Sequence, residues 1–161
     1  APIAIRGNAD GHAKTHAKIT TGTYENKFGI AVEKIRGVYA RAAKMRNIRL
    51  QGLQMHIGSQ LTKVRPFETA VRKVVPLARD LAKMYDLEFF SSGGGMGIIS
   101  EPALKSGDAD WRQKGQARNI LTPAKYAATL VPLLKPLGLR ILVEPGRVIS
   151  GNAGILHGWR S

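Results

Sequence analysis

The sequence predicts an α/β fold, in which a parallel sheet is built from strands and helices that alternate along one domain. Short β-type runs alternate with longer segments whose apolar residues recur at helical spacing. Polar or glycine-rich motifs follow directly after three of the predicted strands. Because ligands bind at the carboxyl ends of strands in parallel β/α folds, these motifs predict one shared ligand site.

The first half of the chain predicts two strand–helix pairs. A β-type segment at 2–6 is followed, after a polar loop, by a helix whose apolar positions begin at Val32. Alternating apolar residues over 48–57 predict the second strand. The second helix begins near Pro66. We expect Pro76 to kink or break it, because proline removes a backbone donor and crowds the preceding turn.

The second half predicts two more strands and one more helix. A short run at 87–90 predicts a buried strand, and the polar stretch 100–119 predicts an inserted loop. Thr122 followed by proline predicts the start of a helix, and Gly138 predicts its end. Residues 139–143 predict the last strand.

The charge of the chain is strongly positive, with 25 Lys and Arg against 11 Asp and Glu and a formal net charge of +14. Such a balance attracts polyanions, including nucleic acid and phosphate ligands. The basic residues are spread over several predicted helices with few aromatic residues between them, whereas nucleic-acid modules cluster them beside stacking rings. We therefore expect no nucleic-acid partner, and a non-catalytic polyanion-binding module remains the alternative from another class.

Several types of site and location are disfavoured by composition. The chain has no cysteine, which excludes disulfides and a thiolate zinc site. His12 and His16 lie in a segment rich in glycine and threonine, where their spacing does not make a metal pair, so we expect no metal. No apolar run is long enough to cross a bilayer, and the first residues do not resemble a secretory signal. We expect a cytoplasmic protein without a membrane partner.

The glycine-rich segment 93–97 directly follows the predicted strand at 87–90. Its glycines are Gly93, Gly94, Gly95 and Gly97. Glycine lets backbone N–H groups approach an anion with no side chain in the way, which predicts a phosphate site. The spacing is not that of a dinucleotide fingerprint and the Lys-Ser/Thr pair of a P-loop is absent. A flexible turn is the alternative.

Two other strand-end motifs carry ionisable side chains. His56 and Ser59 bring an imidazole and a hydroxyl to one strand end, where a hydrogen-bonded structural histidine is the alternative to a functional one. Glu144 and Arg147 lie three residues apart around a turn. A guanidinium suits a carboxylate or phosphate, and a carboxylate beside a heterocyclic nitrogen keeps that nitrogen protonated. The alternative is a local ion pair between the two.

Together the motifs resemble the fold-type III, alanine-racemase-like decarboxylases that use pyridoxal 5'-phosphate, and most closely those acting on diaminopimelate. The matching stretches, in the order of that family, are 25–30, 56–60, 93–98, 144–147 and 153–154. The resemblance implies a TIM-type (β/α)8 barrel. Residues 1–161 would form about half of it as a single partial domain, without the family's C-terminal β domain.

The resemblance also implies an activity and an assembly. The parent enzyme would be a carboxy-lyase that converts meso-diaminopimelate to lysine in lysine biosynthesis, and it would be a homodimer. A sister decarboxylase for ornithine, arginine or carboxynorspermidine is the alternative within this family.

The roles of individual residues follow from the resemblance alone. His56 would stack on the pyridoxal ring, and Glu144 would hold the proton of the ring nitrogen. Arg147 would bind the phosphate and also face the distal carboxylate of the substrate. The other residues expected around the phosphate are Ser59, Gly93, Gly94, Gly95, Gly97 and Gly146.

The catalytic residues of the family have no counterpart in this sequence. The lysine that bonds to the cofactor lies upstream of every matched motif, and the catalytic cysteine belongs to the C-terminal domain. We therefore expect the isolated chain to be marginally stable and inactive. Ser91 and Ser92 also stand where the family usually has an acidic or apolar strand end.

Overall fold

The computed structural model describes residues 1–9, 28–98, 120–151 and 153. In this part of the chain, parallel strands form one sheet in the order β2-β1-β3-β4-β5. The strands are β1 (Pro2–Asn8), β2 (Ile30–Ala31), β3 (Arg49–Met55), β4 (Phe89–Ser91) and β5 (Arg140–Leu142). The four predicted strands are confirmed, with ends that differ by at most two residues, and β2 was not predicted. The predicted loop at 100–119 lies outside the described residues, as does most of the loop after β1.

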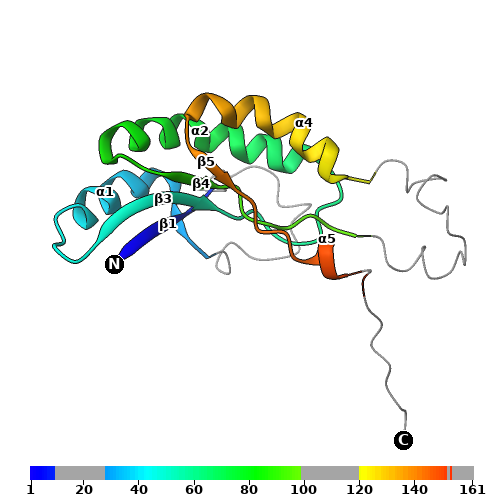
Figure 1. Ribbon diagram of the computed structural model, residues 1–161, viewed down its shortest axis with the longest axis horizontal. Helices are drawn as coiled ribbons and strands as arrows, with labels where there is room; N and C mark the ends of the chain where they lie inside the picture. The colour runs from blue at the N-terminus through cyan, green and yellow to red at the C-terminus, as the bar shows by residue number, and fades with distance from the viewer. Residues whose placement is uncertain (10–27, 99–119, 152, 154–161) are drawn as a thin grey trace, which may run out of the picture.

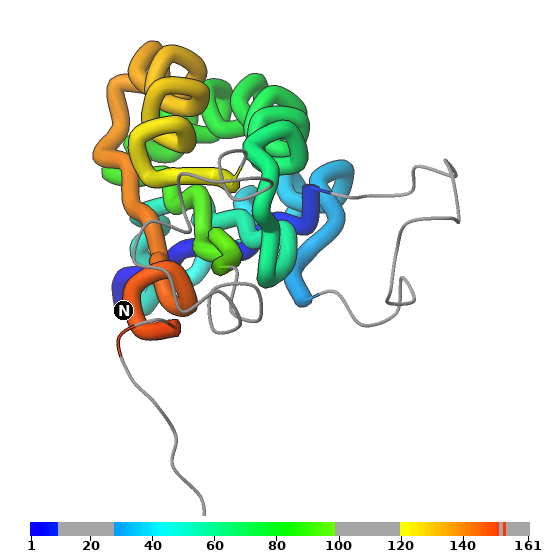
Figure 2. Tube along the Cα trace, turned by 90° about the vertical axis from the view of Figure 1, so that its right-hand side faces the viewer, coloured from blue at the N-terminus to red at the C-terminus, as the bar shows by residue number. Residues whose placement is uncertain are grey.

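The helices are α1 (Val32–Ala42), α2 (Arg65–Tyr85), α4 (Pro123–Leu134) and the short α5 (Arg147–Ser150). Helices α1, α2 and α4 cover one face of the sheet, as Figure 1 shows. Seen from the side in Figure 2, α2 and α4 lie next to each other above the strands. The predicted α/β class is therefore confirmed, and α5 is an element that the sequence did not predict.

Helix α2 runs without interruption through Pro76. The expectation of a break at this proline is wrong. Pro76 lies on the exposed side of the helix, as does Arg72, whose carbonyl loses its helical partner to the proline ring. On the exposed side of a helix, a carbonyl without its helical partner can bond water, so the proline costs little and the helix continues.

The start of α4 is capped as predicted. The side-chain oxygen of Thr122 accepts a hydrogen bond from the backbone N–H of Lys125 at 3.1 Å. This bond satisfies one of the free amides of the first turn. A short 3-10 turn, Lys135–Leu137, extends the helix to Gly138, whose φ of 68° ends it.

The core lies between the sheet and the helices. Its largest fully buried side chains are Tyr39, Phe67, Phe90, Ile35, Leu53, Met55, Leu81 and Leu130. Tyr39 is buried among them, and its hydroxyl donates a hydrogen bond to the carbonyl of Gly52 at 2.8 Å. Burial raises the pKa of Tyr39 well above its ordinary value, and burial likewise raises the pKa of Tyr126 in α4.

These two tyrosines predict that the fold loses stability in alkaline solution. Because both pKa values are higher in the folded chain than in the unfolded one, the unfolded chain loses its phenolic protons first. The free energy of unfolding should therefore not depend on these groups below about pH 10, and should fall as the pH rises above it. Urea unfolding between neutral and alkaline pH measures this slope. In Tyr126→Phe the slope should be shallower, and an unchanged slope would contradict the prediction.

Candidate functional site

The three predicted motifs meet at the carboxyl edge of the sheet. His56 directly follows β3, while the glycine-rich segment 93–97 and Glu144 follow β4 and β5. The hydrogen-bonded ladder continues past the ends of the strands: Glu144 donates its backbone N–H to Gly93 at 2.9 Å, and Leu61 donates to Gly95 at 2.9 Å. The edge is therefore a set of loops joined by backbone hydrogen bonds.

The glycines of segment 93–97 are required by the close packing of these loops. A Cβ atom on Gly93 would lie 2.3 Å from the carbonyl oxygen of Met55, and one on Gly94 would lie 2.1 Å from that of Glu144. A Cβ on Gly95 would lie 2.1 Å from the carbonyl oxygen of Gly58. No real Cβ approaches an oxygen so closely, so only glycine brings these backbones together.

Most amides of the glycine segment already have partners within the chain. The N–H of Gly93 donates to Ser91 Oγ at 3.2 Å, and that of Gly97 donates to the carbonyl of Leu61 at 2.9 Å. The N–H of Gly94 donates to Nδ1 of His56 at 3.3 Å. Among the residues that the structure describes, the N–H of Gly95 has no hydrogen-bond partner. The N–H of Met96 likewise has none within these ranges, so two amides of this segment are free for a ligand.

The imidazole of His56 is held by that bond from Gly94. Because Nδ1 accepts the hydrogen bond, the proton of the neutral ring lies on Nε2. The ring is half-buried at the edge of the sheet. Ser59, in the same loop, is exposed and lies beyond it.

The carboxylate of Glu144 is held by two side chains that the sequence did not single out. Gln54 Nε2 lies 3.2 Å from Oε1 and 3.3 Å from Oε2 of Glu144, and Ser91 Oγ donates to Oε1 at 2.5 Å. Gln54 belongs to β3 and Ser91 to β4, so the two neighbouring strands fix this carboxylate. Their alignment with Glu144 depends on the register between strands, which the sequence pattern does not give.

Arg147 does not form the local ion pair with Glu144 that was the alternative in the sequence. Its Nη1 donates instead to Oε1 of Gln60 at 3.0 Å. Gln60 has a positive φ of 61° and makes two further hydrogen bonds, to the backbone N–H and carbonyl of Ile98. This glutamine joins all three loops of the edge, and no role was predicted for it.

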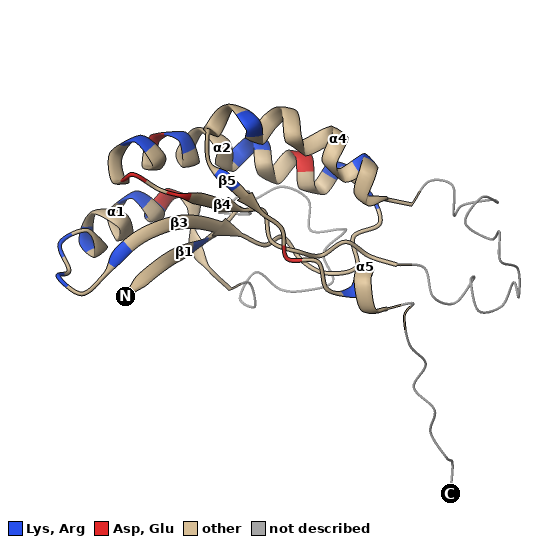
Figure 3. Cartoon of the chain, in the orientation of Figure 1, with Lys and Arg blue, Asp and Glu red and all other residues tan. Residues whose placement is uncertain are grey.

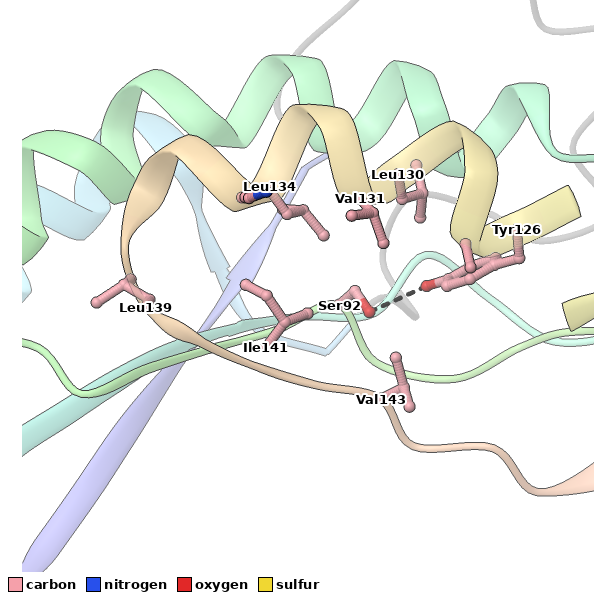
Figure 4. A pocket seen from close by; sticks show the side chains of 10 residues that line it. Ser92, Tyr126, Leu130, Val131, Leu134, Leu139, Ile141 and Val143 are labelled. Carbon is pink, nitrogen blue, oxygen red and sulfur yellow. Dashed lines mark hydrogen bonds between the residues drawn. The ribbon is translucent and has the colours of Figure 1, made fainter. Parts of the chain in front are cut away.

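Ser91 and Ser92 are buried and serve opposite faces of the sheet. The two residues are 2% and 0% exposed. Ser91 faces Glu144, whereas Ser92 accepts a hydrogen bond from the hydroxyl of Tyr126 at 2.9 Å (Figure 4). The departure from the family's usual strand end is thus accommodated by a hydrogen bond on each side.

Two apolar pockets adjoin this region. One, of about 340 Å³, lies between α4 and β5 on the helix side, where Ser92 and Tyr126 line it (Figure 4). The other, of about 370 Å³, adjoins the glycine segment and is lined also by Pro145 and Ile149. Their walls are apolar, so the polar groups suited to an anionic ligand are those of the sheet edge.

The charges of the described residues do not gather into one basic surface. Figure 3 shows Lys and Arg spread over α1, α2 and the other elements. Part of this charge is paired, because Arg36 bonds with Asp80 and Arg49 with Glu88. Within the described ranges, no cluster of His, Cys, Asp or Glu could hold a metal ion, and no helix is long and apolar enough to span a membrane.

The carboxyl edge of this parallel β/α sheet holds an imidazole, a glycine segment, a carboxylate and a guanidinium. This arrangement defines the class of the chain. It is a cofactor-binding part of a β/α-barrel enzyme. Residues 1–151 match the family described as pyridoxal-dependent decarboxylase, pyridoxal binding domain, and the chain belongs to that family. This confirms the predicted family, its barrel domain and its cofactor.

The chain is similar to diaminopimelate decarboxylases over nearly its whole length. It is 38% identical to that of Aquifex aeolicus over 157 residues and 39% identical to that of Haemophilus influenzae over 158 residues. In both comparisons the alignment covers 97% of this chain and 34% of the relative. The chain therefore spans about a third of the length of these relatives.

The fold is also similar to solved structures. The crystal structure of diaminopimelate decarboxylase from Helicobacter pylori complexed with L-lysine matches with a TM-score of 0.68 and 34% identity. That match covers 91% of this chain and 34% of the other.

Proposed function

We propose that this chain supplies the pyridoxal phosphate-binding residues of a decarboxylase that converts meso-diaminopimelate to lysine. The observation that carries the proposal is the arrangement of His56 and Glu144 on either side of the glycine segment, at one edge of the sheet. The relatives that match nearly the whole chain are diaminopimelate decarboxylases, which supports the choice of substrate.

The donors and acceptors of this edge fit pyridoxal phosphate. Its flat ring suits the half-buried imidazole of His56, and its ring nitrogen suits a carboxylate fixed by neighbouring strands. Its phosphate suits the free N–H of Gly95 and the guanidinium of Arg147. The ring face, the ring nitrogen and the phosphate of the cofactor therefore each have a chemically matched partner.

Each residue of the site would have its own role in binding the cofactor. Glu144 holds a proton on the ring nitrogen, and His56 packs against the ring face. Arg147 neutralises the phosphate, together with Gly146, Ser59 and the amides of the glycine segment. Arg147 also faces the distal carboxylate of the substrate. When bound, pyridoxal phosphate supplies an electron sink for the electron pair left by departing CO2.

A chimera tests this proposal. The aligned third of the Aquifex aeolicus relative is replaced by this chain, and CO2 release is measured with meso-diaminopimelate, ornithine and arginine. We expect release from meso-diaminopimelate. Preference for ornithine or arginine would overturn the substrate, and a folded chimera that binds no cofactor would overturn the proposed role. The homodimeric parent enzyme and its cytoplasmic location stay predictions from the sequence.

Replacing Arg147 by alanine should weaken binding of the cofactor through its phosphate. Loss of a charged hydrogen bond costs about 1.5–3 kcal/mol, or roughly tenfold to a hundredfold in affinity. The measurement is the ratio of affinities for pyridoxal phosphate and for pyridoxal, which lacks the phosphate. Arg140→Ala, which removes an exposed arginine at the start of β5, is the control. An unchanged ratio in Arg147→Ala would contradict the assignment.

A further inference from the structure

A row of polar side chains crosses the sheet just before its carboxyl edge. The parallel register pairs Arg6 with Gln54, and Gln54 with Ser91. Side chains in one row of a sheet point to the same face. The preceding residues Leu53 and Phe90 are fully buried in the core under the helices, so the polar row faces away from the helices.

Such a row departs from ordinary barrel packing. Inward layers of β/α barrels are filled mainly by bulky branched residues. Ser91 is 2% exposed, and in the described part of the chain the buried Nε of Arg6 has no hydrogen-bond partner. Polar groups in this setting cost stability unless they are paired, so their presence indicates a function.

The donors of this row converge on one acceptor. Gln54 contacts both oxygens of Glu144, at 3.2 and 3.3 Å, and Ser91 donates to Oε1 at 2.5 Å. Contacts from two strands fix the rotation of the carboxylate as well as its position. Glu144 itself is exposed and follows the end of β5, so nothing in its own segment would hold it in this way.

We propose that Gln54 and Ser91 are positioning residues that hold the Glu144 carboxylate for the ring nitrogen of pyridoxal phosphate. This inference rests on the proposed function. A carboxylate already held in place accepts the ring N–H without reorganising, which makes the interaction stronger. Among the described residues, the other charged or titratable groups at this edge are Arg6 from β1, His56 after β3 and Arg147 in α5.

The test compares two neighbouring serines. Ser91→Ala removes a donor to Glu144, while Ser92→Ala is the matched control, because Ser92 bonds Tyr126 and Leu142 instead. In the 161-residue chain with 13C-labelled glutamate and no cofactor, the carboxyl resonance of Glu144 should move in Ser91→Ala and stay in Ser92→Ala.

The second readout is measured in the chimera. It is the absorbance of bound pyridoxal phosphate as a function of pH, which reports the proton on the ring nitrogen. In Ser91→Ala, loss of one bond to the charged group should lower the pH of this transition by about one unit. Ser91→Thr keeps the hydroxyl and should restore the transition. Gln54→Met should act like Ser91→Ala, whereas Gln51→Met, which removes a contact to Glu88, should not.

The outcomes separate this inference from the proposed function. A carboxyl resonance that is the same in the unchanged chain and in Ser91→Ala overturns the inference, whether or not the cofactor binds. A ring transition that moves equally in Ser91→Ala and Ser92→Ala also overturns it, because the effect would then be structural. A folded chimera that carries the unchanged chain and binds no pyridoxal phosphate overturns the proposed function, and the positioning role falls with it.

Discussion

Replacing Glu144 by glutamine in the chimera lowers kcat for CO2 release by about 100-fold to 1000-fold, the loss typical of a removed electrostatic contact in an active site. Glutamine keeps the size of the side chain and can still bond with Gln54 and Ser91. It carries no negative charge, however, so it cannot hold a proton on the ring nitrogen. Without that proton the ring withdraws electrons less effectively in the transition state.

The measurement is steady-state CO2 release with the cofactor saturating. Binding of substrate should change less than kcat, because the lost interaction strengthens in the transition state. Glu88→Gln is the control, since Glu88 lies directly before β4 and bonds Arg49 and Gln51. A Glu144→Gln chimera with the kcat of its parent would show that the ring nitrogen is not held by this residue.

Gly94→Ala is expected to destabilise the fold by about 3 kcal/mol or more, at the upper end of overpacking effects. The new Cβ would lie 2.1 Å from the carbonyl oxygen of Glu144, so backbone rather than a flexible side chain must move. Movement there displaces both the Glu144 loop and the amide that holds His56. Cofactor binding should be lost together with stability.

Urea unfolding measures the first effect and cofactor titration the second. Gly37→Ala is the matched control, because Gly37 is exposed in α1 and its added Cβ meets nothing within 4 Å. That substitution should raise stability by about 0.5–1 kcal/mol, as for any glycine inside a helix. Equal stability of Gly94→Ala and the unchanged chain would show that the loops can separate at little cost.

The sequence predicted the sheet and its edge well for a physical reason. Helical spacing after Val32 and alternation over 48–57 follow directly from which face is buried, and parallel strands place their following loops at one edge. Thr122 marks the start of α4 and Gly138 the end of the 3-10 turn that extends it, because their backbone chemistry is local. The break predicted at Pro76 is wrong, because the effect of a proline depends on which side of the helix is exposed to solvent.

The partners within the site could not be predicted in the same way. Gln54, Ser91 and Gln60 act across loops and strands that are far apart in the chain, and their contacts depend on register and side-chain direction. The pairing of Arg147 with Gln60 instead of Glu144 is of this kind. The glycines also have a role that the sequence did not predict. They let the loops pack closely, in addition to leaving backbone amides free for a ligand.

Ser91 at the end of β4 and Ser92 directly after it connect the ligand side of the sheet with its helical side. Ser91 contacts the carboxylate of Glu144, and Ser92 contacts Tyr126 of α4. Because adjacent residues of a strand point in opposite directions, the two positions can be altered independently. A substitution at residue 91 would therefore act on the Glu144 carboxylate, and one at residue 92 on the contact with α4.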